Sequence, residues 1–415
     1  MYSKVLRNRQ FLKLWGAQLT SQIAAQLLNY GLLIRIYEIA SKSSFANSSV
    51  SLLIVAIGLP AIFLAVPAGA YVDHRDRKTI LVWTNALRAL LVPLLIFIDT
   101  QIIAVYVVVF FISVFSQFFV PAEGAALPKL VSKKELVPAN SLFIFTLNAS
   151  FIIGYSLAGP VIANSGIHAI YIIVTIAFLV ATGLSLFLPK IPAVHEGKFD
   201  FSGIIRTITQ DLHGHFGQIV GSKVILFPMM LIALAQTIVG VVSALAPALS
   251  QAFFQVGLEQ SSYWLVMPAG IGLVLGSVFA AKLLEHRNKV KVIFFSLFCA
   301  SAILVALPIV GGNSDGTPLK VASMIMTFSL GVFNAMILVS AQTLLQYAST
   351  DRLRGQVFGT LNMMINIAAL VPVFAAGLLA DTFNALAVVA GVGALLCIVG
   401  VVLVMRFRGI SARYA

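Results

Sequence analysis

Amide side chains inside an apolar segment are the first residues of this sequence that could contact a solute. Four of them recur at helical spacing in the first apolar stretch: Gln18, Gln22, Gln26 and Asn29. At about 100° per residue they fall within roughly 80° of arc and form one polar stripe. Amides facing lipid are costly, so the stripe is expected to face protein or a water-filled cavity. Hydrogen bonding between helices is the alternative role for each amide.

One arginine stands out because it lies in the middle of an apolar run. Arg88 occurs in WTNALRALLVPL, with Asn85 one helical turn earlier. A charge at this depth needs a partner or water. Arginine does not readily lose its proton, so Arg88 is no proton relay. It is expected to pair with a carboxylate within the protein or to hold an anionic group of a substrate.

Carboxylates are the residues that could carry protons. The sequence has 14 acidic residues, and none lies in the middle of an apolar run. Proton antiport usually needs a carboxylate or histidine whose pKa is raised by burial. Glu38 and Glu123, each near the end of an apolar run, are the candidates for proton coupling. Alternatively, both are ordinary interfacial carboxylates, with Glu38 paired to Arg35 and Glu123 solvated.

The composition identifies the elements that must position these residues. Hydrophobic residues make up 60% of the chain and charged residues 10%, against about 25% charged in a soluble domain. A bilayer-spanning helix needs roughly 20 mostly apolar residues, and continuous apolar runs in lipid must be helical. The runs predict twelve spans: 11–38, 49–71, 79–98, 101–120, 139–163, 168–188, 223–252, 262–283, 290–310, 319–347, 356–380 and 383–405.

The basic residues predict the orientation of these spans. If the N-terminus is cytoplasmic, 23 of the 27 Lys and Arg residues fall on the cytoplasmic side. Lys42 and Lys320 alone fall outside, so the asymmetry places both termini in the cytoplasm. The net charge of +13 is scattered over short loops. This distribution suits anionic membrane lipids as partners and excludes nucleic acid.

The longest polar stretch, 189–222, divides the chain. It is predicted to be a cytoplasmic linker containing an amphipathic interfacial helix. Six spans precede it, in a half covering 1–188, and six follow it, in a half covering 223–415. The predicted fold is therefore an all-α membrane protein with two pseudo-symmetric six-helix halves. The sequence shows no disulfide framework or metal-binding pattern, and no metal or cofactor is expected.

Residues 69–78, GAYVDHRDRK, place six ionisable side chains between two apolar runs. The segment resembles the major facilitator superfamily motif G-x-x-x-D-R-x-G-R-K/R between helices two and three. Four positions match: Gly69, Asp73, Arg77 and Lys78. His74 and Asp76 replace an arginine and a glycine of that motif.

Three further segments extend this resemblance over nearly the whole chain. Residues 118–142, 344–364 and 377–381 resemble the branch of the superfamily that holds macrolide-efflux proteins and the enterobactin exporter. The resemblance implies twin halves that rock around a central cavity lined by helices one, four, seven and ten. It places further polar residues at that cavity or beside it: Gln117, Gln236, Asn334, Asn362 and Asn366.

The resemblance implies that the motif at 69–78 latches the two halves in one conformational state, partly against helix eleven. Gly69 lets helices approach closely, and Arg75, Arg77 and Lys78 hold the loop in the cytoplasm. Asp73 can accept hydrogen bonds from a helix start or pair with an arginine. The alternative is that these charges only set the topology.

A second motif lies in the fifth predicted span. Gly154, followed by Gly159 and Pro160, resembles the antiporter motif of the superfamily, which is associated with exporters. Glycine permits tight helix packing, and proline bends the helix. An ordinary contact between helices is the alternative interpretation.

Together these observations predict a secondary transporter of the bacterial cytoplasmic membrane. It is expected to act as a monomer, exporting a small amphipathic molecule of the drug or siderophore type in exchange for protons. A lipid or lysophospholipid flippase of the same fold is the alternative. A membrane enzyme would need a catalytic cluster within the spans, and the sequence has none there. A non-transporting receptor would not need the polar stripe of the first helix.

Overall fold

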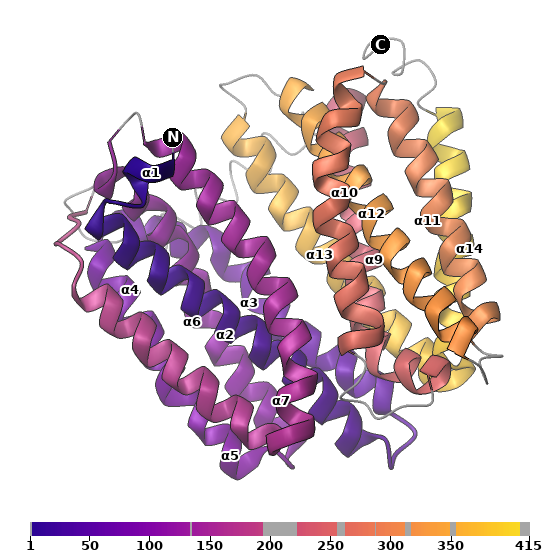
Figure 1. Ribbon diagram of the computed structural model, residues 1–415, viewed down its shortest axis with the longest axis horizontal. Helices are drawn as coiled ribbons and strands as arrows, with labels where there is room; N and C mark the ends of the chain where they lie inside the picture. The colour runs from indigo at the N-terminus through magenta and orange to yellow at the C-terminus, as the bar shows by residue number, and fades with distance from the viewer. Residues whose placement is uncertain are drawn as a thin grey trace. The chain divides into compact units, whose positions relative to one another are not determined.

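Helices account for the architecture throughout the described part of the chain. The computed structural model describes residues 2–132, 135–193, 222–254, 262–286, 288–311, 317–348 and 354–406. Within these ranges the chain forms helices and short connections, and no strand (Figure 1). The predicted all-α fold class is confirmed. The amphipathic helix predicted in the linker lies outside the described residues.

The first half of the chain forms a short helix followed by six predicted spans. Its helices are α1 (Tyr2–Val5), α2 (Arg9–Ala40), α3 (Ala46–Asp73), α4 (Arg77–Leu91), η1 (Val92–Leu94), α5 (Leu95–Ile98), α6 (Ile102–Leu130) and α7 (Leu136–Leu186). The third predicted span comprises α4, η1 and α5 in succession. Gly166 has a φ of 74° and divides α7 at the point between the fifth and sixth predicted spans. Glycine adopts this left-handed conformation without steric cost.

The second half contributes the other six spans. Its helices are α9 (Lys223–Phe254), the π-helical turn η3 (Ser262–Val266) leading into α10 (Met267–His286), α11 (Lys289–Gly311), α12 (Thr317–Ala348), α13 (Arg354–Phe383) and α14 (Ala385–Arg406). Asn384 separates the last two helices with a φ of 87°. Its side-chain oxygen accepts a hydrogen bond from the Ala387 N–H at 2.8 Å and so caps α14.

The predicted spans coincide with helices, with one difference that matters for function. The fourth span was expected to end at residue 120, but α6 continues through Pro121 to Leu130. Glu123 therefore lies inside a membrane-spanning helix rather than beyond its end.

By their internal contacts the residues form two compact units. One unit holds Met1–Arg35 and Ala56–Gln210, and the other holds Ile36–Val55 and Asp211–Ala415. The junction after Gln210 falls within the linker predicted at 189–222. Residues 36–55 contain the end of α2 and the start of α3. Their contacts group them with the second unit.

Each unit has its own buried apolar core. In the first unit, Phe11 of α2, Phe119 of α6 and Phe143 of α7 pack with residues of α3 and α4. In the second unit, Leu231 of α9, Leu297 of α11 and Ile337 of α12 form the corresponding cluster.

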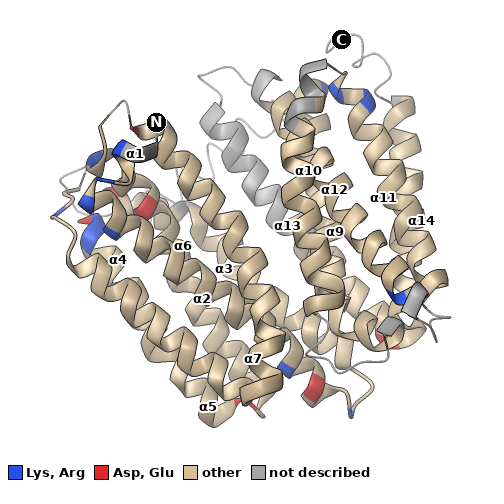
Figure 2. Ribbon diagram, viewed as in Figure 1, with Lys and Arg blue, Asp and Glu red and all other residues tan. Residues whose placement is uncertain are grey.

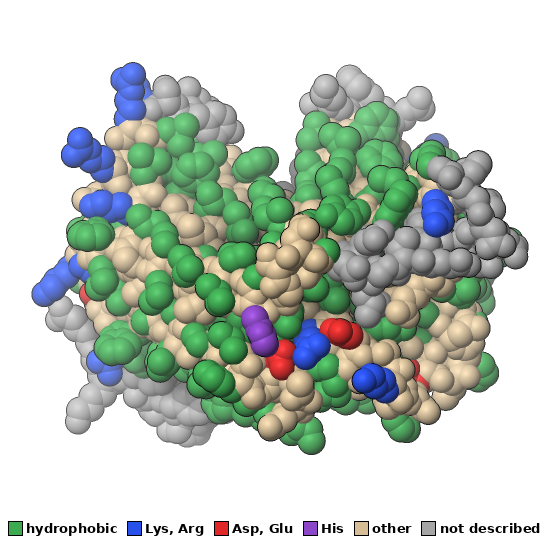
Figure 3. Space-filling model, turned by 60° about the horizontal axis from the view of Figure 1, so that its bottom comes forward, with side chains coloured by type: hydrophobic (Ala, Val, Ile, Leu, Met, Phe, Trp, Pro, Cys, Tyr) green, Lys and Arg blue, Asp and Glu red, His purple; other side chains and the backbone are tan. Residues whose placement is uncertain are grey.

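The helix surfaces are suited to lipid. Nine helical segments in the described ranges are long and apolar enough to cross a membrane. Phe97 and Ile103, both 79% exposed, are examples of large apolar side chains on the outside. Figure 2 shows most charged residues near helix ends, and Figure 3 shows hydrophobic side chains spread over the face it presents. The chain is a multi-pass membrane protein.

Candidate functional site

A buried carboxylate and amide pair forms the centre of the candidate site. Glu123 of α6 is only 4% exposed, and Gln18 of α2 is buried beside it. The Gln18 side-chain N–H donates to Glu123 Oε1 at 3.4 Å. This burial contradicts the alternative that Glu123 is a solvated carboxylate beside a helix end. Because α2 and α6 are far apart in the sequence, the pairing could not be seen from helical spacing.

One oxygen of each partner is left without a hydrogen bond. Among the described residues, neither Glu123 Oε2 nor Gln18 Oε1 has a partner. A buried polar atom without a partner costs about 1–3 kcal/mol. The pair is therefore incomplete in its ionised form.

Arg88 lies near this pair and is held by its own set of contacts. It is 2% exposed, and its guanidinium donates to Asn85 Oδ1 at 2.7 Å and to the Thr84 carbonyl at 3.2 Å. The guanidinium carbon lies 4.6 Å from the ring centre of Phe119 and 4.7 Å from that of Phe178. Asn85, one turn earlier, is thus a partner of Arg88, whereas the carboxylate partner expected from the sequence is replaced by an amide, a carbonyl and two aromatic rings. Arg88 and Glu123 attract each other electrostatically, although no ion pair joins them.

The remaining amides of the α2 stripe are half-buried. Gln22, Gln26 and Asn29 continue along the helix from Gln18. At Gln26, α7 approaches closely, because a Cβ placed on Gly154 would stand 2.7 Å from the Leu27 nitrogen. Gly154 therefore lies at a close contact between α2 and α7, as either interpretation of the motif predicts.

The other two residues of that motif also lie in α7. Gly159 is buried and Pro160 is half-buried. The Pro160 carbonyl accepts a hydrogen bond from the Asn164 side chain at 2.9 Å.

The polar residues predicted on later helices have separate environments. Gln117 is half-buried and donates to the Ser113 carbonyl at 3.4 Å within α6. Asn334 of α12 is buried and donates to the Ala235 carbonyl of α9 at 2.9 Å, a bond between helices. Gln236 is half-buried.

The side chains of Asn362 and Asn366, predicted near the cavity on the eleventh span, lie outside the described residues. The backbone of α13 places the two positions one turn apart, as their spacing predicts.

The motif at 69–78 binds the chain segment that follows α7. Asp76 caps α4, with its carboxylate accepting from the Lys78 N–H at 3.3 Å and the Thr79 hydroxyl at 2.9 Å. The same carboxylate accepts from the Ile191 N–H at 2.9 Å. Asp76, which replaces the motif's glycine, therefore performs the capping that the sequence suggested for Asp73.

Arg77 completes this attachment. Its backbone N–H donates to the Ile191 carbonyl at 3.0 Å, and its side chain donates to the Pro192 carbonyl. Its guanidinium also pairs with Asp73 at 3.5 Å, where Asp73 is half exposed. Asp73 thus takes the second predicted role, pairing with an arginine.

Gly69 does not show the expected close approach. A Cβ placed there would meet no atom of a described residue within 4 Å. Lys78 is half-buried, and Arg75 is exposed in the loop between α3 and α4.

Glu38 has a different environment from Glu123, because its side chain is exposed near the end of α2. Arg35, on the preceding turn, pairs with Asp99 at 3.1 Å, and His168 approaches the same carboxylate at 3.5 Å. The sequence did not predict this cluster, since Arg35 lies in α2, Asp99 follows the end of α5 and His168 lies in α7. Of the two candidates for proton coupling, only Glu123 is buried.

The start of α3 carries a junction that the sequence also did not predict. Asp381, near the end of α13, accepts from the Asn47 and Ser48 backbone N–H groups at 2.9 Å each. The Asn47 side-chain amide and the Ser48 hydroxyl donate to it as well, at 3.0 and 2.5 Å. A carboxylate at a helix N-terminus is favourable, because it meets free N–H groups and the positive end of the helix dipole. Asp381 belongs to the segment 377–381, which the sequence singled out only as part of a resemblance.

Comparison with known proteins identifies the family of this fold. The chain is 23% identical over 391 residues to "Uncharacterized MFS-type transporter YfiS" of Bacillus subtilis (strain 168), covering 92% of this chain and 91% of the relative. It is 24% identical over 314 residues to "Uncharacterized MFS-type transporter YkuC" of the same organism, covering 73% and 71%.

Solved transporters share the fold at low identity. A POT family transporter in complex with 5-aminolevulinic acid superimposes with a TM-score of 0.76 at 11% identity, covering 97% of each chain. A bacterial homologue of the iron transporter ferroportin gives 0.71 at 13% identity, covering 96% of this chain and 99% of the other. The model of the Major Facilitator Superfamily matches residues 14–371, and the chain belongs to this family of transporters.

Proposed function

We propose that this protein exports a small amphipathic molecule, of drug or siderophore type, across the bacterial cytoplasmic membrane in exchange for protons. Glu123 carries the proposal, because it is a buried carboxylate with one unpartnered oxygen inside a membrane-spanning helix. Intramembrane carboxylates of this kind characterise proton pathways. The resemblance to the macrolide-efflux and enterobactin-exporter branch supports export, with both termini in the cytoplasm.

Protonation of Glu123 would complete the buried pair. A proton on Oε2 makes that oxygen a donor, and Gln18 Oε1 is the acceptor left unpartnered beside it. The acid and the amide would then form two hydrogen bonds instead of one. In the ionised state, the positive charge of Arg88 attracts the carboxylate. Each protonation state of Glu123 therefore has its own stabilising partner, which is what a group that binds and releases protons requires.

Alternating access needs contacts at both ends of the moving helices that can break. At the Asp73 end of α3, the motif supplies the Asp73–Arg77 pair, and the resemblance makes this segment a latch. At the Asn47 end, Asp381 of α13 holds α3 with four hydrogen bonds. We assign this Asp381 junction to the state that the structure represents, in which this end of α3 is joined to α13. Transport would require the junction to open in the other state.

Glu123→Gln is the variant that tests the coupling. The protein, reconstituted in proteoliposomes with an imposed pH gradient, is presented with a macrolide, a catecholate siderophore and a fluorescent lysophospholipid. The variant is expected to lose pH-driven accumulation of the transported compound. It should retain exchange of that compound across the membrane without a gradient, because glutamine mimics the protonated carboxyl group.

Glu38→Gln is the matched control, since Glu38 is an exposed glutamate of the neighbouring α2. It is expected to behave as the parent protein does. Undiminished pH-driven accumulation by Glu123→Gln would reject Glu123 as the coupling group. Movement of the lysophospholipid alone would replace export of a soluble amphiphile with the flippase alternative.

A further inference from the structure

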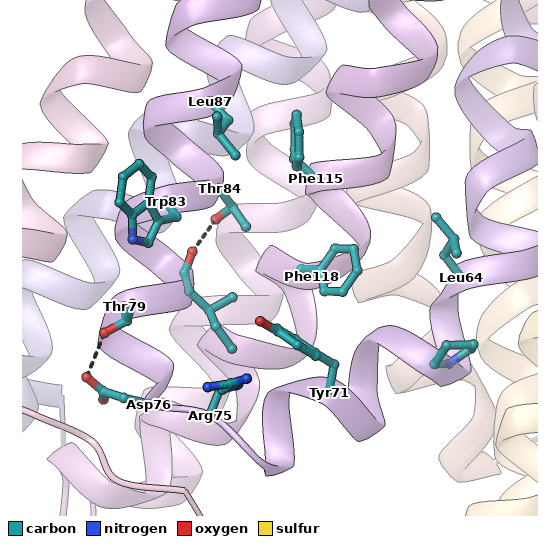
Figure 4. A pocket seen from close by; sticks show the side chains of 12 residues that line it. Leu64, Tyr71, Arg75, Asp76, Thr79, Trp83, Thr84, Leu87, Phe115 and Phe118 are labelled. Carbon is teal, nitrogen blue, oxygen red and sulfur yellow. Dashed lines mark hydrogen bonds between the residues drawn. The ribbon is translucent and has the colours of Figure 1, made fainter. Parts of the chain in front are cut away.

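A groove in the first unit is separate from the Gln18–Glu123 pair. It encloses about 620 Å³ between α3, α4 and α6 (Figure 4). Its walls are apolar, with Leu64 and Pro67 from α3, Trp83 and Leu87 from α4, and Phe115 and Phe118 from α6. Trp83 is 61% exposed, so this wall is open to the surroundings of the protein.

The charged residues of the groove lie at one end. Arg75 and Asp76 are at that end, with Arg75 beside the ring of Tyr71 (Figure 4). The Arg75 guanidinium carbon is 5.7 Å from the centre of that ring. Among the residues the structure describes, no carboxylate forms an ion pair with Arg75. The neighbouring Asp76 carboxylate is directed to other donors, accepting from the Lys78 and Ile191 backbone N–H groups and from the Thr79 hydroxyl. The Thr84 hydroxyl, further along α4, donates to the Ile80 carbonyl within the helix.

The length of the groove matches one leaflet of a bilayer. From Thr79 to Leu87, α4 rises by about 12 Å, at 1.5 Å per residue. Half of a typical hydrocarbon core is about 15 Å. The polar end coincides with the loop between α3 and α4, where the chain leaves its spans. The cation therefore lies at headgroup depth, and the apolar walls extend towards the bilayer centre.

We propose that this groove binds an anionic phospholipid from the leaflet that faces the α3–α4 loop. The phosphate would contact the Arg75 guanidinium, and an acyl chain would lie along Trp83, Phe115 and Phe118. Charge complementarity selects the headgroup, since Arg75 is a cation without an ion-pair partner among the described residues. The inference does not depend on proton coupling, because neither Gln18 nor Glu123 lines the groove.

Trp83 provides a direct readout of occupancy. The sequence has three tryptophans, so replacing Trp15 and Trp264 with phenylalanine leaves Trp83 as the sole emitter. The protein in bilayers of unlabelled lipid is titrated with dibrominated phosphatidylglycerol or, separately, with dibrominated phosphatidylcholine. Quenching of Trp83 is expected to show a preference of about fivefold for phosphatidylglycerol, as one basic side chain at an anionic headgroup gives about 1 kcal/mol.

Two variants separate this site from general surface charge. In Arg75→Gln, the preference for phosphatidylglycerol over phosphatidylcholine is expected to fall to a ratio close to one. Lys78→Gln removes an equal charge from the same region without altering a residue of the groove, and it is expected to retain the preference. Phosphatidylglycerol retained on the detergent-purified protein, counted by native mass spectrometry, should fall in the Arg75 variant alone.

Four results would overturn the proposal. Equal quenching by both lipids would show that no anionic headgroup is selected. Equal loss of preference in both variants would attribute it to the net charge of the loop. Competition by millimolar inorganic phosphate would make the site one for a free anion, and competition by the transported compound would make it a substrate site.

Discussion

At the scale of single residues, buried polar side chains divide into those that are fully partnered and those that are not. Arg88 belongs to the first kind, with Asn85, the Thr84 carbonyl and two aromatic rings around it. Glu123 and Gln18 belong to the second, since each has an oxygen without a described partner. A partnered charge stabilises one structure, whereas an incomplete pair gains a bond when a proton arrives. This difference favours a structural role for Arg88 and supports the proton-coupling role proposed for Glu123.

Arg88→Ala is therefore expected to act mainly on stability. The substitution leaves Asn85 Oδ1 without its donor and opens a space between Phe119 and Phe178. Changes of this kind cost about 2–5 kcal/mol, so the melting temperature in detergent should fall by about 5 °C or more. The melting temperature of Arg88→Lys should lie between those of the parent protein and Arg88→Ala, because lysine keeps the charge but cannot stack as a planar group.

Lys42→Ala is the control for that measurement, since Lys42 is exposed in a loop. Its melting temperature is expected to match that of the parent protein. Equal melting temperatures for the Ala variants of Arg88 and Lys42 would contradict a structural role for the buried arginine.

The local partner of Arg88 was predictable from the sequence, and the partner of Glu123 was not. Asn85 and Arg88 lie three residues apart on one helix, so their contact follows from helical geometry. Gln18 and Glu123 come from different helices, and a single sequence does not give the register between helices. Glu123 was also expected outside its span, because the apolar run ends near Pro121 although α6 does not. Proline inside a helix removes one hydrogen bond and need not end it where neighbouring helices pack against it.

At the scale of secondary-structure elements, α3 is the helix whose contacts bear most directly on conformational change. Its Asn47 end receives the Asp381 carboxylate, and its Asp73 end begins the motif. Near the first of these ends, Gly377 of α13 lies close to Ser51, because a Cβ placed on Gly377 would stand 2.1 Å from Ser51 Oγ. Hydropathy predicted both helices, but not this contact, since Asn47 and Asp381 are 334 residues apart.

Asp381→Asn is expected to open the Asn47 end of α3. The asparagine carries no charge and can accept through one oxygen only, so at least two of the four hydrogen bonds are lost. Ser51→Cys, in a background without Cys299 and Cys397, reports the opening because Ser51 is fully buried. Labelling by a membrane-impermeant maleimide should accelerate about tenfold. This factor corresponds to a loss of about 1.4 kcal/mol from the free energy that keeps the Asn47 end closed.

Glu38→Gln serves as the control, because it removes an exposed carboxylate close to the same end of α3. It is expected to leave the labelling rate unchanged. If the labelling rate were also unchanged in Asp381→Asn, the junction would contribute to helix packing only and would not stabilise one conformational state over another.

At the scale of the whole molecule, hydropathy and charge predicted the spans but not the conformational state of the transporter. In the described ranges the predicted apolar runs coincide with helices, because lipid allows the backbone little else. In our proposal the conformational state depends instead on a few long-range polar contacts, each worth about 1.5–3 kcal/mol when one partner is charged. Such contacts leave no periodic pattern in the sequence. This explains why the fold was predicted while the Asp381 junction and the buried Glu123 were not.

The two ends of α3 lead to a prediction for the conformational equilibrium of the whole transporter. We propose that the Asp381 junction holds the Asn47 end in one state, and that the latch which the resemblance implies at Asp73 acts in the other state. Asp381→Asn should therefore favour the state open at the Asn47 end, and Asp73→Asn should oppose it. Losing about 1.4 kcal/mol on one side changes the ratio of the two states about tenfold. The double variant should return close to the parent ratio, although with faster exchange, because both states have lost a contact.

Spin labels introduced by Lys42→Cys and Lys320→Cys, in a background without Cys299 and Cys397, allow the populations to be measured. Both positions lie in segments predicted on the outer side of the membrane, one in each half of the chain. Pulsed electron resonance should give two distance populations, whose ratio shifts in opposite directions in the two single variants. A shift in the same direction would mean that the two carboxylates stabilise one state together, and the latch assigned to Asp73 would then be wrong. The transport rate provides a second check, because a carrier must visit both states: each single variant should be slower than the parent, and the double variant should recover part of the loss.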